Sequence, residues 1–216
     1  MFRVWERWGA ALGIVGVIAW AIAFVVGNGS PGTSDSDAKI ASWLASSSNQ
    51  DSQITAFFLF LAGTLCAIGF FAAVRERLAA SGHAEMGALA FGAGIASSVM
   101  GMLAIVMFTA PSFVASDTRS SDVTPSMFRV LSDMGYQCWV VGAVIGAIVV
   151  WATSAVALRT GLLPRWFGWL GILVGVVQLF ALFFLPILLF WLWILVTGAL
   201  LTWRNPVVTT SPLPAP

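Results

Sequence analysis

The chain has 216 residues, of which 59% are hydrophobic and only 9% are charged. An ordinary soluble domain has roughly a quarter of its residues charged, so this composition excludes a water-soluble globular protein and indicates a chain that lies mostly in lipid. The formal net charge is +1 and the sequence contains no block of like charges, so it offers no surface for nucleic acid.

Six apolar segments have about the length that a membrane-spanning helix needs. Such a helix takes about 20 apolar residues, because the hydrocarbon core is about 30 Å thick. The run from Trp166 to Trp203 is too long for one span, and Pro186 inside it predicts a tight turn between two spans. The predicted fold class is all-α, a polytopic transmembrane helix bundle with six spans: Gly9–Gly27, Gln53–Val74, Met86–Ala110, Tyr136–Leu158, Trp166–Phe184 and Leu188–Trp203.

The first of these segments is longer than the apolar region of a signal peptide, so we expect it to be retained as a span. Residues 1–204 are expected to form a single transmembrane domain. The remaining residues, 205–216, are rich in Pro and Thr and have no apolar periodicity, which predicts a disordered cytoplasmic tail.

The basic residues predict the orientation of the chain in the membrane. If the N-terminus is cytoplasmic, seven of the ten Lys and Arg residues lie on the cytoplasmic side. An excess of basic residues marks the cytoplasmic loops of membrane proteins, so both termini are predicted to be cytoplasmic. Tryptophans at the ends of the spans predict an aromatic belt at the inner headgroup level: Trp5, Trp8, Trp166, Trp169 and Trp203.

The two outer loops, Asn28–Ser52 and Pro111–Gly135, are long, and each carries the signature of a short amphipathic helix. In the first loop, Ile40, Trp43 and Leu44 fall on one helical face. In the second loop, Thr124 followed by Pro125 is the order of a helix cap and a first helical residue, and apolar residues around Phe128 follow. We expect both helices to lie flat against the outer ends of the spans.

Glycine pairs at four-residue spacing recur in three spans, at Gly9 and Gly13, Gly142 and Gly146, and Gly171 and Gly175. Small residues at this spacing let helix backbones approach closely in lipid. The favoured interpretation is packing within this bundle. The alternative is contact with a membrane protein partner or a second copy of the chain. Membrane lipid is expected to cover the remaining outer surface of the spans.

Few polar residues lie inside the spans, and the candidates for binding are Gln137 and Gln178. Gln178 lies twelve residues beyond Trp166, about 18 Å into the membrane. An interhelical hydrogen bond is the favoured interpretation of each amide, and a ligand contact is the alternative. The inner-loop pair His83 and Glu85 lacks the third ligand that a zinc site requires. The sequence thus predicts no catalytic, cofactor-binding or metal-binding residue, and no enzyme.

The inner loop and its following span, "RTGLLPRWFGWLGIL", complete a familiar layout with the six spans and the two outer loops. The chain resembles an uncharacterised family of bacterial six-helix integral membrane proteins, a domain of unknown function, and the segment Arg159 to Arg165 is the most recognisable part. The resemblance implies a bacterial cytoplasmic membrane and assigns no site residues.

Two functions remain. The first expectation is a non-catalytic partner or regulatory component of the membrane. The alternative is a small outward-facing carrier or lipid-binding protein, with a pocket near Gln178 that is not coupled to protons because the spans hold no Asp, Glu, Lys, Arg or His. A polar cavity that reaches Gln178 favours the carrier, whereas a solidly packed bundle favours the regulatory component.

Overall fold

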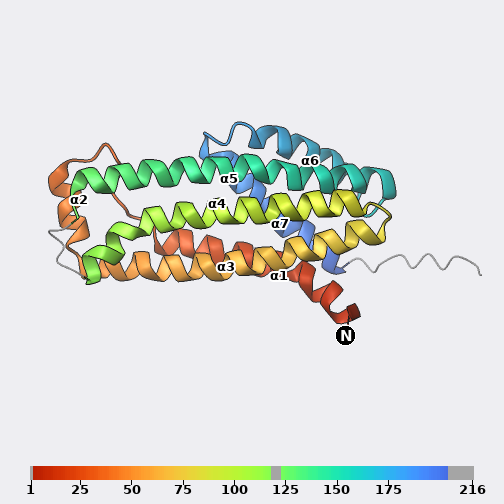
Figure 1. The fold of residues 1–216 in the computed structure, drawn as a ribbon, viewed down its shortest axis with the longest axis horizontal. Coiled ribbons are helices and arrows are strands. Elements are labelled where there is room, and N and C mark those ends of the chain that lie inside the picture. Colours follow the sequence, from red (N-terminus) through yellow and green to blue (C-terminus); the bar gives the residue numbers. More distant parts are fainter. Residues whose placement is uncertain (1, 118–122, 204–216) are drawn as a thin grey trace, which may run out of the picture.

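The computed structural model describes residues 2–117 and 123–203, and every regular element in these two ranges is a helix (Figure 1). Five of the helices are long and apolar enough to cross a membrane. The predicted all-α class is confirmed, and the chain is a helical membrane protein. In chain order the helices are α1 (Phe2–Val26), α2 (Asp37–Leu44), α3 (Ser47–Ala80), α4 (Ala84–Asp117), α5 (Pro125–Thr160), α6 (Arg165–Gln178) and α7 (Phe184–Trp203).

The fifth predicted span, 166–184, is not a full-length helix. Helix α6 has 14 residues, which is about 21 Å of helix and less than the bilayer core of about 30 Å. The chain then turns back through residues 179–183 with hydrogen bonds between residues three apart. The break therefore precedes Pro186, which lies in the first turn of α7. Proline is tolerated there because the amide groups of a first helical turn have no partner within the helix.

The second outer-loop helix is also not a separate element. The Thr124 hydroxyl accepts the amide of Met127 at 3.2 Å, and Pro125 is the first helical residue. The helix that begins here continues through Gly135 to Thr160 without a break. Gly135 does not end it because its missing side chain lets α5 lie close to α4, where an added Cβ would be 3.1 Å from the Ala104 carbonyl oxygen. The amphipathic segment is therefore the first part of α5.

The end of the bundle that carries α2 has an apolar cluster of its own. Ile40 and Leu44 of α2 are buried against the end of α4 and the start of α5, and the Trp43 ring lies 6.1 Å from that of Phe128. We call this group the cap cluster and this end of the molecule the cap end. The cap cluster consists of Ile40, Trp43, Leu44, Ala115, Val123 and Phe128.

The opposite end, which we call the basal end, contains the α3–α4 and α5–α6 connections. Four of the tryptophans predicted for the inner belt are more than 60% exposed: Trp8, Trp166, Trp169 and Trp203. The side chain of Trp5 and the tail at 205–216 lie outside the described residues. At the same end, Arg159 and Arg165 precede Trp166 and Trp169 in the sequence, and Arg75 lies in the last part of α3.

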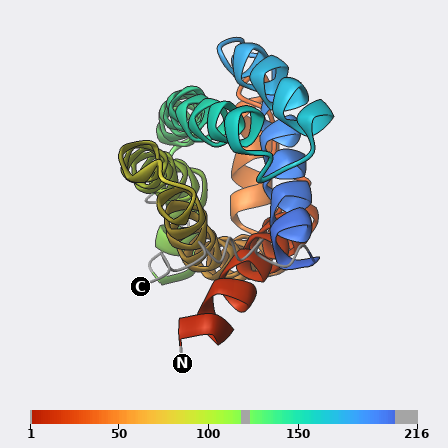
Figure 2. The same ribbon diagram turned by 90° about the vertical axis from the view of Figure 1, so that its right-hand side faces the viewer.

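The long helices surround a central axis rather than packing in layers (Figure 2). Each of α1, α3, α4 and α5 packs against the next, and α7 closes the ring by packing on α1, while α6 packs mainly on the outside of α5. The predicted glycine pairs are covered by the chain itself. An added Cβ would meet Phe70 at Gly13, Phe190 at Gly146 and Trp151 at Gly175, in each case within 2.8 Å. These glycine faces serve packing inside the ring.

Candidate functional site: an aromatic pocket near the cap end

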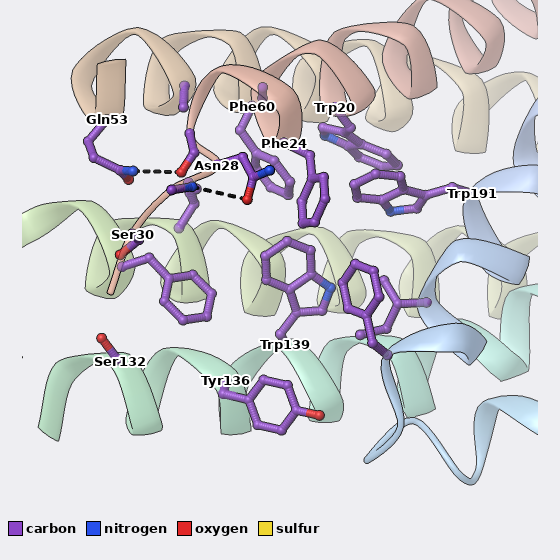
Figure 3. A pocket seen from close by; sticks show the side chains of 18 residues that line it. Trp20, Phe24, Asn28, Ser30, Gln53, Phe60, Ser132, Tyr136, Trp139 and Trp191 are labelled. Carbon is purple, nitrogen blue, oxygen red and sulfur yellow. Dashed lines mark hydrogen bonds between the residues drawn. The ribbon is translucent and has the colours of Figure 1, made fainter. Parts of the chain in front are cut away.

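A cavity of about 270 Å³ lies inside the ring of helices (Figure 3). Helices α1, α3, α4, α5 and α7 line it, together with residues 27–30 that follow α1. Water takes about 30 Å³ per molecule in the liquid, so the cavity has the volume of about nine waters. An apolar cavity of about 150 Å³ is already large enough to bind benzene. The cavity, which we call the aromatic pocket, therefore has room for one small organic molecule.

Four aromatic rings from four helices form the floor of the pocket. The ring centroid of Trp20 lies 5.7 Å from Phe60 and 5.5 Å from Trp191. The Trp139 centroid lies 5.7 Å from Phe60 and 6.3 Å from Trp191, which closes the circuit. These separations are those of aromatic pairs in contact. We call the four rings the aromatic collar.

The close approach of α1 and α3 places Trp20 in the collar. The Trp20 Nε1 donates a hydrogen bond of 3.3 Å to the Thr64 Oγ1, which orients the indole. Next to Thr64, an added Cβ on Gly63 would be 2.6 Å from the Trp20 ring and 2.8 Å from the Gly16 carbonyl oxygen. The indole therefore occupies the space that a side chain at position 63 would take.

A second, smaller chamber of about 40 Å³ lies beyond the collar, toward the basal end. All four collar rings line both cavities, so the collar separates them. The chamber has hydroxyl groups in its wall, from Thr64, Ser97 and Ser98. Its volume is that of about one water molecule.

The rim of the pocket toward the cap end is polar. The Gln53 Nε2 donates a hydrogen bond of 2.8 Å to the Gly27 carbonyl oxygen (Figure 3). This bond pairs one of the carbonyls that the end of α1 leaves without a helical partner. Asn28, Ser30 and Ser132 complete the rim. The pocket thus has hydrogen-bonding groups at one end and aromatic rings at the other.

An ionic clamp fixes the segment that carries Asn28 and Ser30. The Arg129 guanidinium on α5 donates to the carbonyl oxygens of Thr33 at 2.9 Å and Asp35 at 2.8 Å, and to the Asp37 carboxylate at 2.6 Å. The Asp35 carboxylate accepts hydrogen bonds from Lys39 Nζ and the Gly32 amide, which lower its pKa below the ordinary value. The segment between α1 and α2 is thereby tied to the start of α5.

No side chain in the pocket lining is charged at neutral pH. The lining residues include no Asp, Glu, Lys, Arg or His. A charged ligand would lose its water shell here without gaining an opposite charge. The lining therefore suits an uncharged molecule with an apolar body.

Neither predicted site residue lines the pocket. Gln178 is the last residue of α6 and is completely buried, and its Nε2 donates a hydrogen bond of 2.6 Å to the Pro186 carbonyl oxygen on α7. Gln137 lies on α5 with its side chain exposed on the outside of the bundle. The structure does not bring the two amides together, and the cavity does not reach Gln178.

The described residues contain no group of three or more His, Cys, Asp and Glu side chains that could hold a metal ion. The His83 Nδ1 lies 3.0 Å from the Ser81 carbonyl oxygen at the basal end, far along the bundle from the pocket rim. Cys66 and Cys138 are both free and half-buried.

The residues that form the pocket give only a weak signal in the sequence. Trp20 and Trp191 stand well inside apolar runs, whereas Trp139 stands near the start of its run, where tryptophan usually anchors at the interface. Gln53 stands at the start of a span. Comparison with protein-family models, with curated proteins and with solved structures gives no match to this chain.

Proposed function

We propose that this membrane protein binds one small, uncharged amphiphilic molecule in the aromatic pocket and performs no catalysis on it. The observation that carries the proposal is a cavity with an aromatic floor, a polar rim and no charged side chain in its lining. Small-molecule sites in proteins are typically apolar and aromatic, with a few polar groups that orient the ligand. The apolar part of the ligand would contact the collar, and its polar part would reach the rim.

The pocket favours the binding protein over the purely regulatory component. A component that acts through its outer surfaces needs no internal cavity, and protein interiors are otherwise packed with few voids larger than water. The glycine faces that could have served association are covered by this chain. The pocket differs from the one expected in that it is aromatic and lies away from Gln178.

The proposal includes an orientation in which the cap end faces outward and the basal end faces the cytoplasm of a bacterial cell. The argument is the excess of arginine at the basal end together with its exposed tryptophans. In this orientation α6 enters the membrane from the cytoplasmic side and α7 returns to it, so the termini stay on the same side as with six full spans. The pocket then opens outward.

Cysteine labelling in intact bacterial cells tests the orientation. Cys66 and Cys138 are first replaced by alanine, and one cysteine is then introduced at Ser47, where α3 begins at the cap end, or at Ala84, where α4 begins at the basal end, both exposed positions. A membrane-impermeant maleimide is expected to modify Ser47→Cys in intact cells and Ala84→Cys only after lysis. The opposite pattern would show that the basal end faces outward.

A pocket-filling substitution tests the binding function. Ser132→Phe places a ring in the rim, whereas Val141→Phe places the same ring on the exposed side of α5. With N-phenylnaphthylamine as a neutral aromatic probe, we expect saturable binding to the wild type and to Val141→Phe. Ser132→Phe is expected to weaken binding by about fivefold or more, because overpacking a site costs about 1 kcal/mol or more.

Binding is measured in nanodiscs by energy transfer from tryptophan to the probe, and neither substitution changes the number of tryptophans. Native mass spectrometry of the three purified proteins is the second readout. A molecule retained by the wild type and Val141→Phe but lost from Ser132→Phe would identify the ligand. Equal probe binding by all three proteins, or none by any, would refute the proposed function.

A further inference from the structure

We propose that the ligand reaches the aromatic pocket sideways from the outer leaflet of the membrane, through an opening between α1 and α5 above the start of α7. This inference rests on the proposed function and narrows the ligand class to neutral molecules dissolved in the bilayer. Three aromatic side chains close the opening: Phe24 of α1, Tyr136 of α5 and Phe184 of α7. We call the opening the side port.

The side port exists because α5 extends further toward the cap end than α7 does. The Tyr136 hydroxyl donates a hydrogen bond to the Leu182 carbonyl oxygen in the α6–α7 turn, which sets the level of that turn against α5. Pro125, where α5 begins, is eleven residues before Tyr136, so α5 extends about 16 Å beyond this level. No part of α6 or α7 accompanies α5 over this length (Figure 1).

The wall at the side port is one side chain thick. Phe24, Tyr136 and Phe184 all line the pocket, and they are 45%, 37% and 40% exposed. The Phe24 and Phe184 rings stack with their centroids 5.4 Å apart. One ring stack and one hydrogen bond therefore close the route between the pocket and the surroundings.

The surface outside the port is one that lipid covers. Val25 is 72% exposed, Leu182 is 68% exposed and Phe183 is 69% exposed, and none of the neighbours of these residues in the sequence is charged. The first charged side chain on the α5 side is Asp133, about one turn above Tyr136. The port thus lies just below the level at which charged side chains begin.

On the water side, the pocket ends at its rim, where the lining residues 28–30 are exposed. Beside this rim, the cap cluster packs α2 against the end of α4 and the start of α5, and Ile40, Leu44 and Phe128 are at most 1% exposed. The Arg129 clamp holds the segment between α1 and α2 against α5 at the same end. The pocket therefore has two sides with exposed lining residues, the polar rim and the side port, and only the side port is bordered by an apolar surface that suits a ligand dissolved in the bilayer.

Exchange kinetics of N-phenylnaphthylamine in nanodiscs test the side port. Phe184→Ala removes a ring from the wall, while the control Phe183→Ala removes the neighbouring, more exposed ring, which does not line the pocket. Phe184→Ala is expected to speed probe binding and release by about fivefold, the value of one lost aromatic pair. Phe183→Ala is expected to keep the wild-type rates.

Two further variants keep the test decisive. Tyr136→Phe removes only the hydroxyl that bonds to Leu182 and is expected to speed exchange by about fivefold, even if Phe184→Ala does not fold. Ser30→Phe narrows the water-facing rim and is expected to leave the rates unchanged.

The outcomes separate the two proposals. If the wild type binds the probe but Ser30→Phe slows exchange, or the wall variants do not speed it, the side port is wrong and the pocket remains a binding site. If the wild type does not bind the probe, or if Ser132→Phe does not weaken its binding, the proposed function itself fails.

Discussion

Replacing Gly63 by alanine is expected to lower the free energy of unfolding by about 1–3 kcal/mol, the usual cost of overpacking a well-packed interior. The added Cβ would lie 2.8 Å from the Gly16 carbonyl oxygen on α1, a backbone atom that cannot rotate away. It would also lie 2.6 Å from the Trp20 ring. Helix α1 and the indole must therefore both move, and we expect weaker probe binding to accompany the loss of stability. Equilibrium unfolding in mixed micelles, followed by circular dichroism, measures the change.

Gly92→Ala is the matched control for Gly63→Ala. Gly92 lies inside α4, and an added Cβ would meet nothing within 4 Å. Alanine costs less conformational entropy than glycine in a helix, so this substitution is expected to raise stability by about 0.5–1 kcal/mol. If Gly63→Ala stabilised the protein as much as Gly92→Ala, the close contact of α1 with α3 would be incorrect.

Replacing Gln178 by alanine is expected to lower the free energy of unfolding by about 2–4 kcal/mol. The side chain is completely buried and supplies a hydrogen bond to the Pro186 carbonyl oxygen, so its removal leaves both a void and an unpaired acceptor. Gln178→Leu fills most of the void without restoring the donor. The difference between the two variants therefore separates the loss of packing from the loss of the hydrogen bond.

Gln137→Ala serves as the control, because this glutamine is exposed on the outside of α5. A substitution at such a surface position is expected to change stability by at most about 0.5 kcal/mol. The same variants also decide whether the two predicted site residues bind the ligand. We expect both to keep probe binding within about twofold of the wild type, since a surface change of that size alters affinity little. A selective loss of binding in Gln178→Ala at unchanged stability would contradict the structural role.

The sequence predicts the helical class because few backbone conformations are stable in lipid. A backbone in hydrocarbon must satisfy its own hydrogen bonds, so a long apolar segment becomes a helix. The same argument fails between α6 and α7, where the turn at residues 179–183 is as apolar as the helices on both sides. Hydropathy offers no contrast there, and Pro186 misleads because proline fits a first helical turn as well as it marks a break. Gly135 is misleading for a similar reason, since in α5 it serves close packing.

The candidate site was harder to predict because it depends on how four helices are rotated about their axes. Trp20, Phe60, Trp139 and Trp191 are far apart in the chain and meet only through the ring order of α1, α3, α5 and α7. From the sequence alone, an aromatic residue inside a span is equally compatible with a position that faces lipid and with one packed against another helix. Glutamine is rare in this apolar sequence, so the prediction selected Gln137 and Gln178. The pocket is instead lined mainly by aromatic residues, which are common along the whole chain.

The shortness of α6 has a consequence for the lipids around the protein. Beside α4 and α5 the protein matches a full bilayer, but beside α6 its helical apolar length is about 21 Å. A bilayer meets so short a hydrophobic length by thinning locally, at a cost of a fraction of a kcal/mol per Å of mismatch. The annulus of lipid is therefore expected to be uneven, with headgroups drawn down and acyl chains disordered on the flank where α6 turns into α7. Thinner membranes should relieve this deformation, so the protein should partition into them from a mixture of thick and thin bilayers.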